Sequence, residues 1–199
     1  GAHAAAGGAG ASTRSRPPGA AAGGATDGTA GRIMTAPGIP FLGTTFQNPV
    51  LLAAGVAGFG HEVADVIDLE ALGGIVSKAV TPEPRRGHPG PRVAEFRGGM
   101  LNAVGLANPG LEHVATIDLP QLDRLTRARV IVNVAGRTVD DYVRVVERLS
   151  PLGVVAAFEL NASCPNPSAG GIEFSASAAA LTELVRRCRA VTTKPLVAK

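Results

Sequence analysis

The sequence is poor in the residues that carry several common functions. Its 199 residues include two cysteines, no tryptophan and 4% aromatic residues. Cys164 and Cys188 cannot build a disulfide framework and match no zinc-ligand spacing, so we expect a reducing, cytoplasmic setting. The histidines are dispersed, with no pair at metal-ligand spacing. We therefore predict no metal site and interpret His61, His88 and His113 as surface residues.

Long apolar runs and strong charge clusters are also missing. No stretch approaches the roughly 18 to 20 apolar residues of a membrane helix, so no transmembrane segment is predicted. The formal charge of +3 is mildly basic, but the basic residues are scattered and stacking rings are few, which argues against a nucleic-acid surface. A G-x-S-x-G elbow is absent, which argues against a Ser-His-Asp hydrolase.

The first residues differ in texture from the rest. Residues 1–31 contain 20 glycines or alanines and show no sustained periodicity. Such a stretch cannot repay the entropy lost on ordering. We predict a disordered leader over residues 1–33, although its arginines and scarcity of acids also fit an organelle transit peptide. The folded domain is expected over residues 34–199.

Short apolar runs then alternate with amphipathic stretches. The runs predict strands at residues 49–58, 74–80, 129–136, 154–160 and 194–199. The amphipathic stretches predict helices at 62–74, 138–153 and 175–192. Apolar strands that alternate with helices belong in a parallel sheet covered by helices, either doubly wound or a (β/α)8 barrel. No G-x-G-x-x-G fingerprint follows the first strand, which weakens the dinucleotide-binding version.

Polar residues gather just past the strand ends, which favours the barrel. They are Lys78, Asn133, Asn161 and Lys199. A TIM barrel carries its site at the mouth formed by the carboxyl ends of its strands. The fold class predicted is therefore α/β, with about the first five strands and four helices of a (β/α)8 TIM barrel.

The interval over residues 81–129 is much longer than a usual βα loop of about 2 to 6 residues. It contains a predicted hairpin that turns at residues 97–99 and a polar, glycine-rich stretch at 102–110. We expect this excursion to fold across the barrel mouth and wall the pocket.

Cys164 is the strongest candidate for chemistry. Cys188 shares a helical face with Leu181, Leu184 and Val185, as a buried structural cysteine would. Cys164 instead lies in a proline-containing loop directly after a strand, in a predicted mouth position. The pattern therefore favours a functional thiol at Cys164.

Lysines and asparagines at the strand ends indicate the ligand. Lys78 and Lys199 both close apolar runs, where a cation is costly unless it faces a mouth or an anion. Asn133 lies inside a buried run and needs hydrogen-bond partners. Other asparagines in loops are individually more often structural. Together, such amides can supply donors and acceptors to a planar heterocycle such as a pyrimidine or a flavin.

Five sequence blocks, taken together and in order, carry a family resemblance. They are "NPVLLAAGVAGFG", "GGIVSKAVTPEPRRGHPGPRVAE", "GGMLNAVGLANPG", "VIVNVAG" and "ELNASCPNPSAGGIEF". They resemble class 1 dihydroorotate dehydrogenases, most closely the class 1B catalytic subunits. The likeness covers residues 48–199 almost without gaps, and five blocks in this order are highly specific.

The resemblance implies an FMN-dependent barrel that oxidises (S)-dihydroorotate to orotate in pyrimidine synthesis, with Cys164 as the base that takes the C5 proton. Substrate contacts carry over to Lys78, Asn102, Ala103, Val104, Gly105, Leu106, Asn161 and Asn166. Flavin contacts carry over to Ala54, Lys78, Ala79, Asn133, Asn161 and Lys199. Ala54 stands where related sequences commonly carry a serine, so we expect that hydrogen bond to be missing or made by backbone.

The resemblance also implies partners. Class 1B enzymes pair with a subunit that carries FAD and an iron–sulfur cluster and passes electrons to NAD, whereas fumarate is the class 1A acceptor. A homodimer core is expected, with no nucleic-acid or membrane partner.

A whole barrel runs to roughly 250 residues, and its phosphate site typically lies in loops after strands seven and eight. With five predicted strands, the chain by itself is expected to be an inactive fragment that does not hold FMN tightly. Two alternatives stay open. One is a flavin barrel of the dihydropyrimidine dehydrogenase type, and the other is a non-catalytic truncated scaffold. "NAVGLANPG" and "SCPNP" favour the dihydroorotate type over the first.

Overall fold

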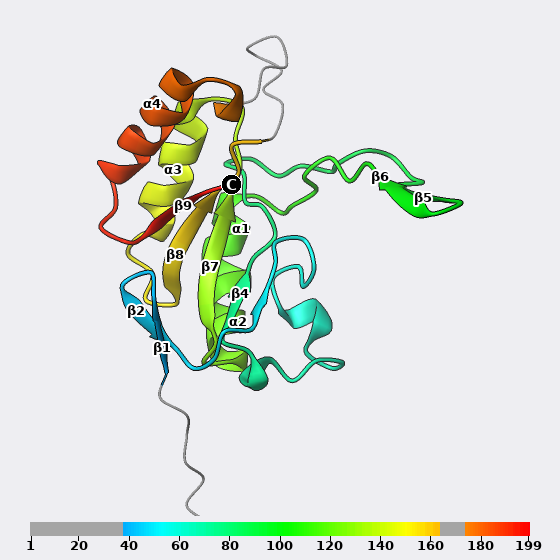
Figure 1. The fold of residues 1–199 in the computed structure, drawn as a ribbon, viewed down its shortest axis with the longest axis horizontal. Helices are drawn as coiled ribbons and strands as arrows, with labels where there is room; N and C mark the ends of the chain where they lie inside the picture. Colours follow the sequence, from blue (N-terminus) through cyan, green and yellow to red (C-terminus); the bar gives the residue numbers. More distant parts are fainter. Residues whose placement is uncertain (1–37, 164–173) are drawn as a thin grey trace, which may run out of the picture. The chain divides into compact units, whose positions relative to one another are not determined.

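A parallel sheet of five strands organises the computed structural model, which describes residues 38–163 and 174–199 (Figure 1). The strands, in spatial order, are β3 (Leu51–Leu52), β4 (Gly74–Val76), β7 (Arg129–Val134), β8 (Val155–Leu160) and β9 (Leu196–Ala198). All neighbours pair in parallel. Spatial order follows chain order, as in part of a (β/α)8 barrel, and the described residues form no closed barrel.

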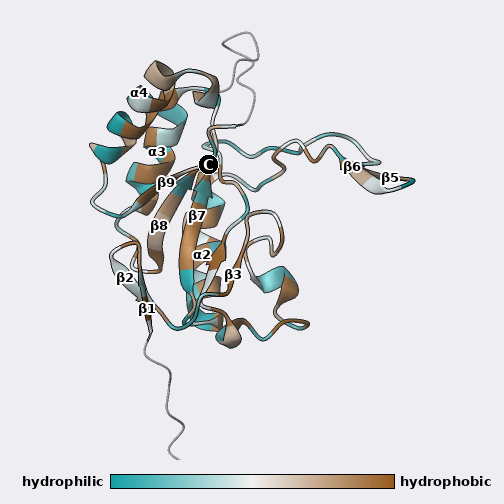
Figure 2. Ribbon diagram, in the orientation of Figure 1, coloured by the Kyte–Doolittle hydropathy of each residue, from teal (hydrophilic) through white to brown (hydrophobic). Residues whose placement is uncertain are grey.

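Helices cover one face of the sheet. They are α1 (Leu111–His113), the π-helical turn η3 (Val114–Asp118), α2 (Leu119–Leu125), α3 (Val139–Leu149) and α4 (Ala178–Arg189). Their buried side chains pack with those from one face of the strands into the larger apolar core. Figure 2 shows the resulting pattern, with apolar strands β7 and β8 beside helices α3 and α4 of mixed hydropathy.

The opposite face of the sheet carries a smaller apolar cluster. It consists of Phe46, Val76, Ile131 and Ala157. Phe46 comes from a hairpin of β1 (Ile39–Phe41) and β2 (Thr44–Phe46), which the sequence did not predict. Arg129 at the start of β7 donates from Nε to the Thr45 carbonyl at 2.9 Å. The hairpin therefore lies at the amino ends of the strands and leaves their carboxyl ends uncovered by β1 and β2 (Figure 1).

The two later helices form where the sequence predicts them. The Thr138 hydroxyl accepts from the Asp141 N–H, and the Asp141 carboxylate accepts from the Thr138 N–H, a reciprocal capping box that begins α3. Ser177 caps α4 in the simpler way, by accepting from the Ala180 N–H. Both helices are one or more residues shorter at each end than predicted, as is usual for boundaries inferred from periodicity.

The helix predicted over residues 62–74 is wrong. The structure has two short 3-10 turns instead, η1 (His61–Val63) and η2 (Leu69–Ala71). The Asp68 carboxylate accepts from the Glu70 N–H, which starts a new turn and ends continuous helical pairing. Val66, a member of the predicted apolar face, is 83% exposed. The apolar spacing was real, but local side-chain hydrogen bonding interrupted the helix.

The long interval after β4 is partly as predicted. β5 (Val93–Phe96) and β6 (Gly99–Asn102) pair antiparallel around a turn at residues 97–98. All residues of both strands are exposed, and Figure 1 shows the hairpin extending away from the sheet. The expectation that it folds across the mouth is therefore wrong for β5 and β6.

The helical stretch at residues 111–125 was not predicted. Leu111, Val114, Leu119 and Leu122 are all buried along it. Their spacing of three to five residues is the signal that could have revealed a helix. The five-residue step between Val114 and Leu119 spans the π-helical turn, which shifts the apolar face and hides an ordinary helical period.

The π-helical turn ends on a buried acid, Asp118. Its Oδ1 lies 3.9 Å from His61 Nδ1 and 3.7 Å from His113 Nε2. His61 is partly exposed, at 29% of its side chain, and packs against this acid. Burial raises the pKa of the Asp118 carboxyl, while His113 and then His61 lower it in part. In the described part of the chain, no three or more His, Cys, Asp or Glu side chains are grouped so that they could hold a metal ion.

This buried acid predicts a pH-dependent loss of stability. The native Asp118 holds its proton more tightly than the unfolded chain does. Well below the ordinary carboxyl pKa of about 4, the group is protonated in both states, so the raised pKa has no effect on the unfolding free energy. Stability then falls as the pH rises through the elevated pKa. We expect the difference in unfolding free energy between the wild type and Asp118→Asn to shift in favour of the variant from pH 4 to 7, as measured by urea denaturation. The exposed Asp123→Asn on α2 is the control, and a parallel profile for all three proteins contradicts the assignment.

Within the described residues, no helix combines the length and hydropathy that crossing a bilayer demands.

Candidate active site

A polar layer lies beyond the small apolar cluster, toward the carboxyl ends of the strands. Side chains alternate between the two faces of a strand, so every second residue faces the same way. Ile131 and Ala157 belong to the small cluster, and two positions further along their strands come Asn133 and Glu159. These two residues are directly paired in the register of β7 and β8. Strand geometry therefore places an amide beside a carboxylate.

Asn133, Glu159 and Lys199 form a connected network. The Asn133 amide donates from Nδ2 to Glu159 Oε1 at 2.5 Å, and Lys199 Nζ lies 3.5 Å from the same oxygen. Asn133 is 1% exposed and the Glu159 side chain 15% exposed. Because a buried carboxylate needs compensation, the amide and ammonium together stabilise its charge. Lys199 Nζ remains half-exposed at the outer end of this network.

The backbone of Asn133 is fixed as firmly as its side chain. Its N–H donates to Ser77 Oγ at 3.1 Å, and its carbonyl accepts from the Val80 N–H at 2.9 Å. Ser77 is fully buried and donates its own hydroxyl proton to the Lys78 carbonyl. These contacts join the end of β4 to β7, so Lys78 and Asn133 leave the same rigid part of the sheet.

Lys78 is a half-buried cation without an acidic partner among the described residues. Its N–H donates to the Gly58 carbonyl at 2.7 Å, which ties the strand end to the loop after β3. A half-buried ammonium that no carboxylate neutralises favours an anionic or electron-rich ligand. Ala79, next to it, is buried, and Ala54 packs against the small apolar cluster.

Asn161 follows β8 at the same edge of the sheet and is 7% exposed. Its N–H donates to the Val134 carbonyl, and its carbonyl accepts from the Tyr142 hydroxyl at 2.6 Å. Tyr142 is fully buried in α3, so the helix holds the residue in place. The side-chain Oδ1 of Asn161 accepts from Ser163 Oγ at 3.1 Å.

Asn108 anchors the segment 102–106 through hydrogen bonds. Asn108 is 7% exposed, donates from Nδ2 to the Leu106 carbonyl, and accepts at Oδ1 from the N–H groups of Thr81 and Gly110. The Val104 carbonyl also accepts from the His88 N–H at 3.1 Å. These contacts attach the segment to the loop that follows β4. No hydrogen bond or ion pair of the described residues joins its side chains to the polar layer.

The structure thus unites part of the predicted site. Asn133 and Lys199 meet through Glu159, while Lys78 and Asn161 lie on the flanking strand ends. The segment next to the β4 loop makes no hydrogen bond or ion pair to that network among the described residues; it comprises Asn102, Ala103, Val104, Gly105 and Leu106. Cys164, Asn166 and the 1–33 leader lie outside the described residues.

Glu159 and Ser77 were missed by sequence reasoning. Glu159 is the single acid in the run "VVAAFEL". An acid two positions from an inward-facing alanine, at a strand's carboxyl end, is the signal that could have found it. Ser77 carries no such signal, because its contact with Asn133 depends on the register between β4 and β7.

Comparison with known proteins decides the family. The model of the dihydroorotate dehydrogenase family matches residues 39–199. The chain belongs to the dihydroorotate dehydrogenase family. The match names this family rather than the dihydropyrimidine dehydrogenase type that the sequence left open.

Relatives within the family indicate which type of dihydroorotate dehydrogenase the chain is similar to. Proteins named dihydroorotate dehydrogenase B (NAD(+)), catalytic subunit, from Listeria monocytogenes serotype 4a and Desulforudis audaxviator are 48% and 47% identical over 157 and 161 residues, or 79% and 81% of this chain. These alignments cover 51% and 52% of the relatives. The chain therefore spans about half the length of the curated relatives it matches.

A solved structure supports the fold. The crystal structure of DHODH from Eimeria tenella in complex with ferulenol superposes with a TM-score of 0.61 at 24% identity. It covers 77% of this chain and 43% of that one. The five-stranded sheet with its covering helices is thus the arrangement found in part of a family barrel.

The second cysteine of this family member is structural, as predicted. Cys188 is fully buried in α4 among the larger apolar core, and burial raises its pKa to about 11. At pH 8 its thiolate fraction is then about 0.1%. We expect iodoacetamide at pH 8 to leave Cys188 unmodified in the folded protein and to alkylate it after denaturation, as read by peptide mass spectrometry. Native modification of Cys188 at the rate of a free peptide thiol contradicts this placement.

Proposed function

We propose that the protein oxidises (S)-dihydroorotate to orotate with FMN as the electron acceptor, in pyrimidine biosynthesis. The observation that carries the proposal is the family match over residues 39–199, which spans every strand of the sheet and the polar layer at its carboxyl end. Ligands of TIM barrels bind at that end. The proposal concerns the complete gene product.

The polar layer suits the flavin ring. A flavin presents a pyrimidine edge with alternating donors and acceptors, and the layer offers the Asn133 amide, the Glu159 carboxylate and the Lys199 ammonium. When bound, FMN supplies the two-electron acceptor for the hydride that leaves C6 of the substrate. Lys78 and Lys199 would stabilise negative charge that develops on the reduced ring. Ala79 and Asn161 are proposed as further contacts, and Ala54 contributes no side-chain hydrogen bond.

The substrate is an anion, and Lys78 is the cation proposed to meet its carboxylate. Lys78 is half-buried and pairs with no acid of the described ranges, which supports a role toward an anionic ligand. Asn161, Asn166 and the segment 102–106 are proposed to complete the substrate site. The anchoring of Leu106 by Asn108 fixes the end of that segment beside the β4 loop.

We propose Cys164 as the base that removes the C5 proton. The chain has two cysteines, and the burial and raised pKa of Cys188 disqualify it. The Cys164 thiolate would take the proton from C5, while the C6 hydride leaves with its electron pair, so the substrate loses two electrons and two hydrogens. Nearby cations lower a thiol pKa, which Lys78 would provide.

The proposed partner follows from the names of the relatives. They are catalytic subunits of an NAD(+) enzyme, which supports a partner subunit that delivers electrons to NAD. We propose, from the class 1B resemblance, that this subunit carries FAD and an iron–sulfur cluster. Fumarate, the acceptor of the class 1A type, is the alternative. A homodimer core is proposed, and the low cysteine content supports a reducing compartment, the cytoplasm.

The substrate is tested by flavin bleaching. The complete gene product, purified with FMN under anaerobic conditions, is mixed with dihydroorotate or with dihydrouracil, which lacks the carboxylate. We expect dihydroorotate to bleach the flavin absorbance and dihydrouracil to leave it unchanged. Bleaching by dihydrouracil alone would overturn the proposal.

A further inference from the structure

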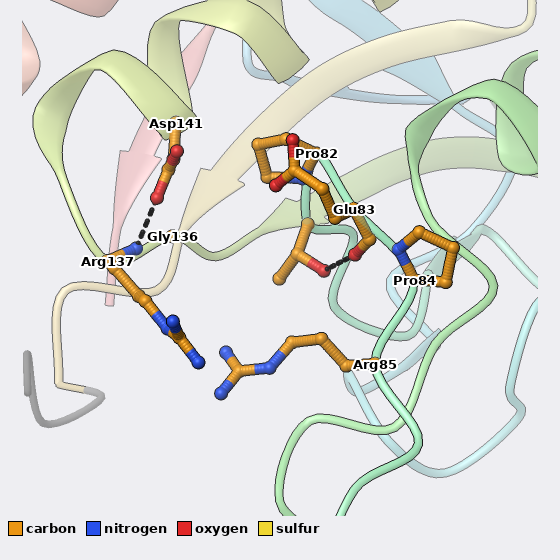
Figure 3. A pocket seen from close by; sticks show the side chains of 8 residues that line it. Pro82, Glu83, Pro84, Arg85, Gly136, Arg137 and Asp141 are labelled. Carbon is orange, nitrogen blue, oxygen red and sulfur yellow. Dashed lines mark hydrogen bonds between the residues drawn. The ribbon is translucent and has the colours of Figure 1, made fainter.

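A cleft lies outside the polar layer, between the loop that follows β4 and the start of α3. It has a volume of about 220 Å³. It is lined by Thr81, Pro82, Glu83, Pro84, Arg85, Gly136, Arg137 and Asp141. Figure 3 shows the side chains of Arg85 and Arg137 extending into it, with their guanidinium ends toward one another.

These two guanidinium groups have no acidic partner within the described part of the chain. Both acids that line the cleft already pair with other groups. Glu83 pairs with Arg144 at 3.0 Å, and the Asp141 carboxylate accepts from the backbone N–H groups of Arg137 and Thr138. Two cations that face each other without a counter-charge repel, and an anion between them relieves that repulsion.

Both arginines extend from fixed backbone. Arg85 exchanges two backbone hydrogen bonds of 2.9 Å with Asn108, which is itself buried and fully engaged. Arg137 follows the buried Gly136, where an added Cβ would lie 2.4 Å from the Asp141 Cβ, so the turn into α3 allows no side chain there. The backbone of both residues is therefore fixed where their side chains enter the cleft, with Arg85 half-buried and Arg137 exposed.

The chemistry favours a phosphate group. Each guanidinium offers a planar fork of donors that matches two oxygens of a phosphate or carboxylate. Two forks that converge carry two positive charges, which a phosphate dianion matches better than a single carboxylate.

A neighbouring hollow extends the cleft. It shares Pro84, Arg85 and Arg137 with the first and adds Arg86, Gly87, His88 and Gly105. An organic substituent on the phosphate would lie along this hollow. Gly105 belongs to the segment 102–106, so a bound molecule would touch the wall of the proposed substrate site.

We propose that this cleft binds a phosphate group, presented either as inorganic phosphate or as a phosphate monoester of a small metabolite. The site is separate from the one for FMN, whose phosphate is expected in loops after the seventh and eighth strands of a barrel. The inference does not depend on which substrate the protein oxidises.

The test is isothermal titration of the FMN-loaded complete protein at constant ionic strength. Inorganic phosphate and ribose 5-phosphate are the ligands, and ribose and orotate are the comparison compounds. We expect Arg85→Gln and Arg137→Gln each to weaken phosphate binding at least about tenfold. Arg186→Gln, an exposed arginine on α4 paired with Glu183, is the matched control and should change affinity less than about twofold. Thermal melts establish that each variant is folded.

The outcomes separate the sources of the phosphate. Tighter binding of ribose 5-phosphate than of inorganic phosphate supports a monoester ligand, and equal binding supports the free ion. The proposal is overturned if wild-type protein binds neither ligand at 10 mM, or if a variant that combines Arg85→Gln with Arg137→Gln binds as the wild type does. It is also overturned if both arginine variants weaken orotate and leave phosphate unaffected.

Discussion

Replacing Cys164 with serine is expected to slow dihydroorotate oxidation at pH 7 by about 10²- to 10⁴-fold while the stoichiometry of bound flavin stays unchanged. A hydroxyl is a far weaker acid than a thiol, whose ordinary pKa is about 8.5, so serine has almost no basic form at neutral pH. The rate of the variant should rise with pH over a wider range than that of the wild type. Stopped-flow measurement of flavin reduction by dihydroorotate reports this step directly.

The control for this experiment is the other cysteine. Cys188 lies fully buried in the apolar core, so Cys188→Ala should lower the melting temperature and leave the rate of flavin reduction within about twofold of wild type. A general effect of losing any thiol would slow both variants. Equal reduction rates for Cys164→Ser and wild type would remove Cys164 from the chemistry.

Replacing Lys78 with methionine is expected to lower kcat/KM for dihydroorotate by about 10²- to 10³-fold. Methionine keeps the length and apolar stem of the lysine and removes its charge. Because Lys78 is half-buried without an acidic partner in the described ranges, loss of the charge should leave the unfolding free energy unchanged or raise it slightly. The combination of lower activity with undiminished stability distinguishes a ligand-facing cation from a structural one.

Lys194 provides the contrast for this prediction. Its Nζ donates to the Leu152 and Val155 carbonyls, and burial lowers its pKa. Lys194→Met should therefore reduce stability and leave kcat/KM of the folded protein nearly unchanged. If Lys78→Met instead destabilises the protein and retains its kcat/KM, Lys78 is structural and the proposed anion contact is wrong.

Elements with strong local signals could be predicted from the sequence. The strands at β4, β7, β8 and β9 and the helices α3 and α4 all follow apolar periodicity with clear stops. The helix predicted at 62–74 had the same periodicity, but the Asp68 carboxylate bonded the chain into separate turns. The helix at 111–125 was not predicted because its π-helical turn interrupts the helical spacing of apolar residues. Periodicity alone does not register such local hydrogen bonding.

The site shows the same division. Lys78, Asn133, Asn161 and Lys199 could be selected because each follows an apolar run at the edge where parallel strands end. Glu159 could not, since its importance lies in the register that sets it beside Asn133 and within 3.5 Å of Lys199. The cleft of Arg85 and Arg137 was hidden for a similar reason. Its two arginines are 52 positions apart in the sequence and meet through the turn at Gly136.

The most direct test of the central claim is a crystal structure of the complete gene product with FMN and orotate. The account predicts the flavin ring against Asn133 and Lys199, with Lys78 Nζ near the orotate carboxylate and the Cys164 sulfur on the face of the orotate ring opposite the flavin. Flavin density at another part of the molecule, or a Cys164 sulfur enclosed by apolar side chains away from Lys78, would contradict it.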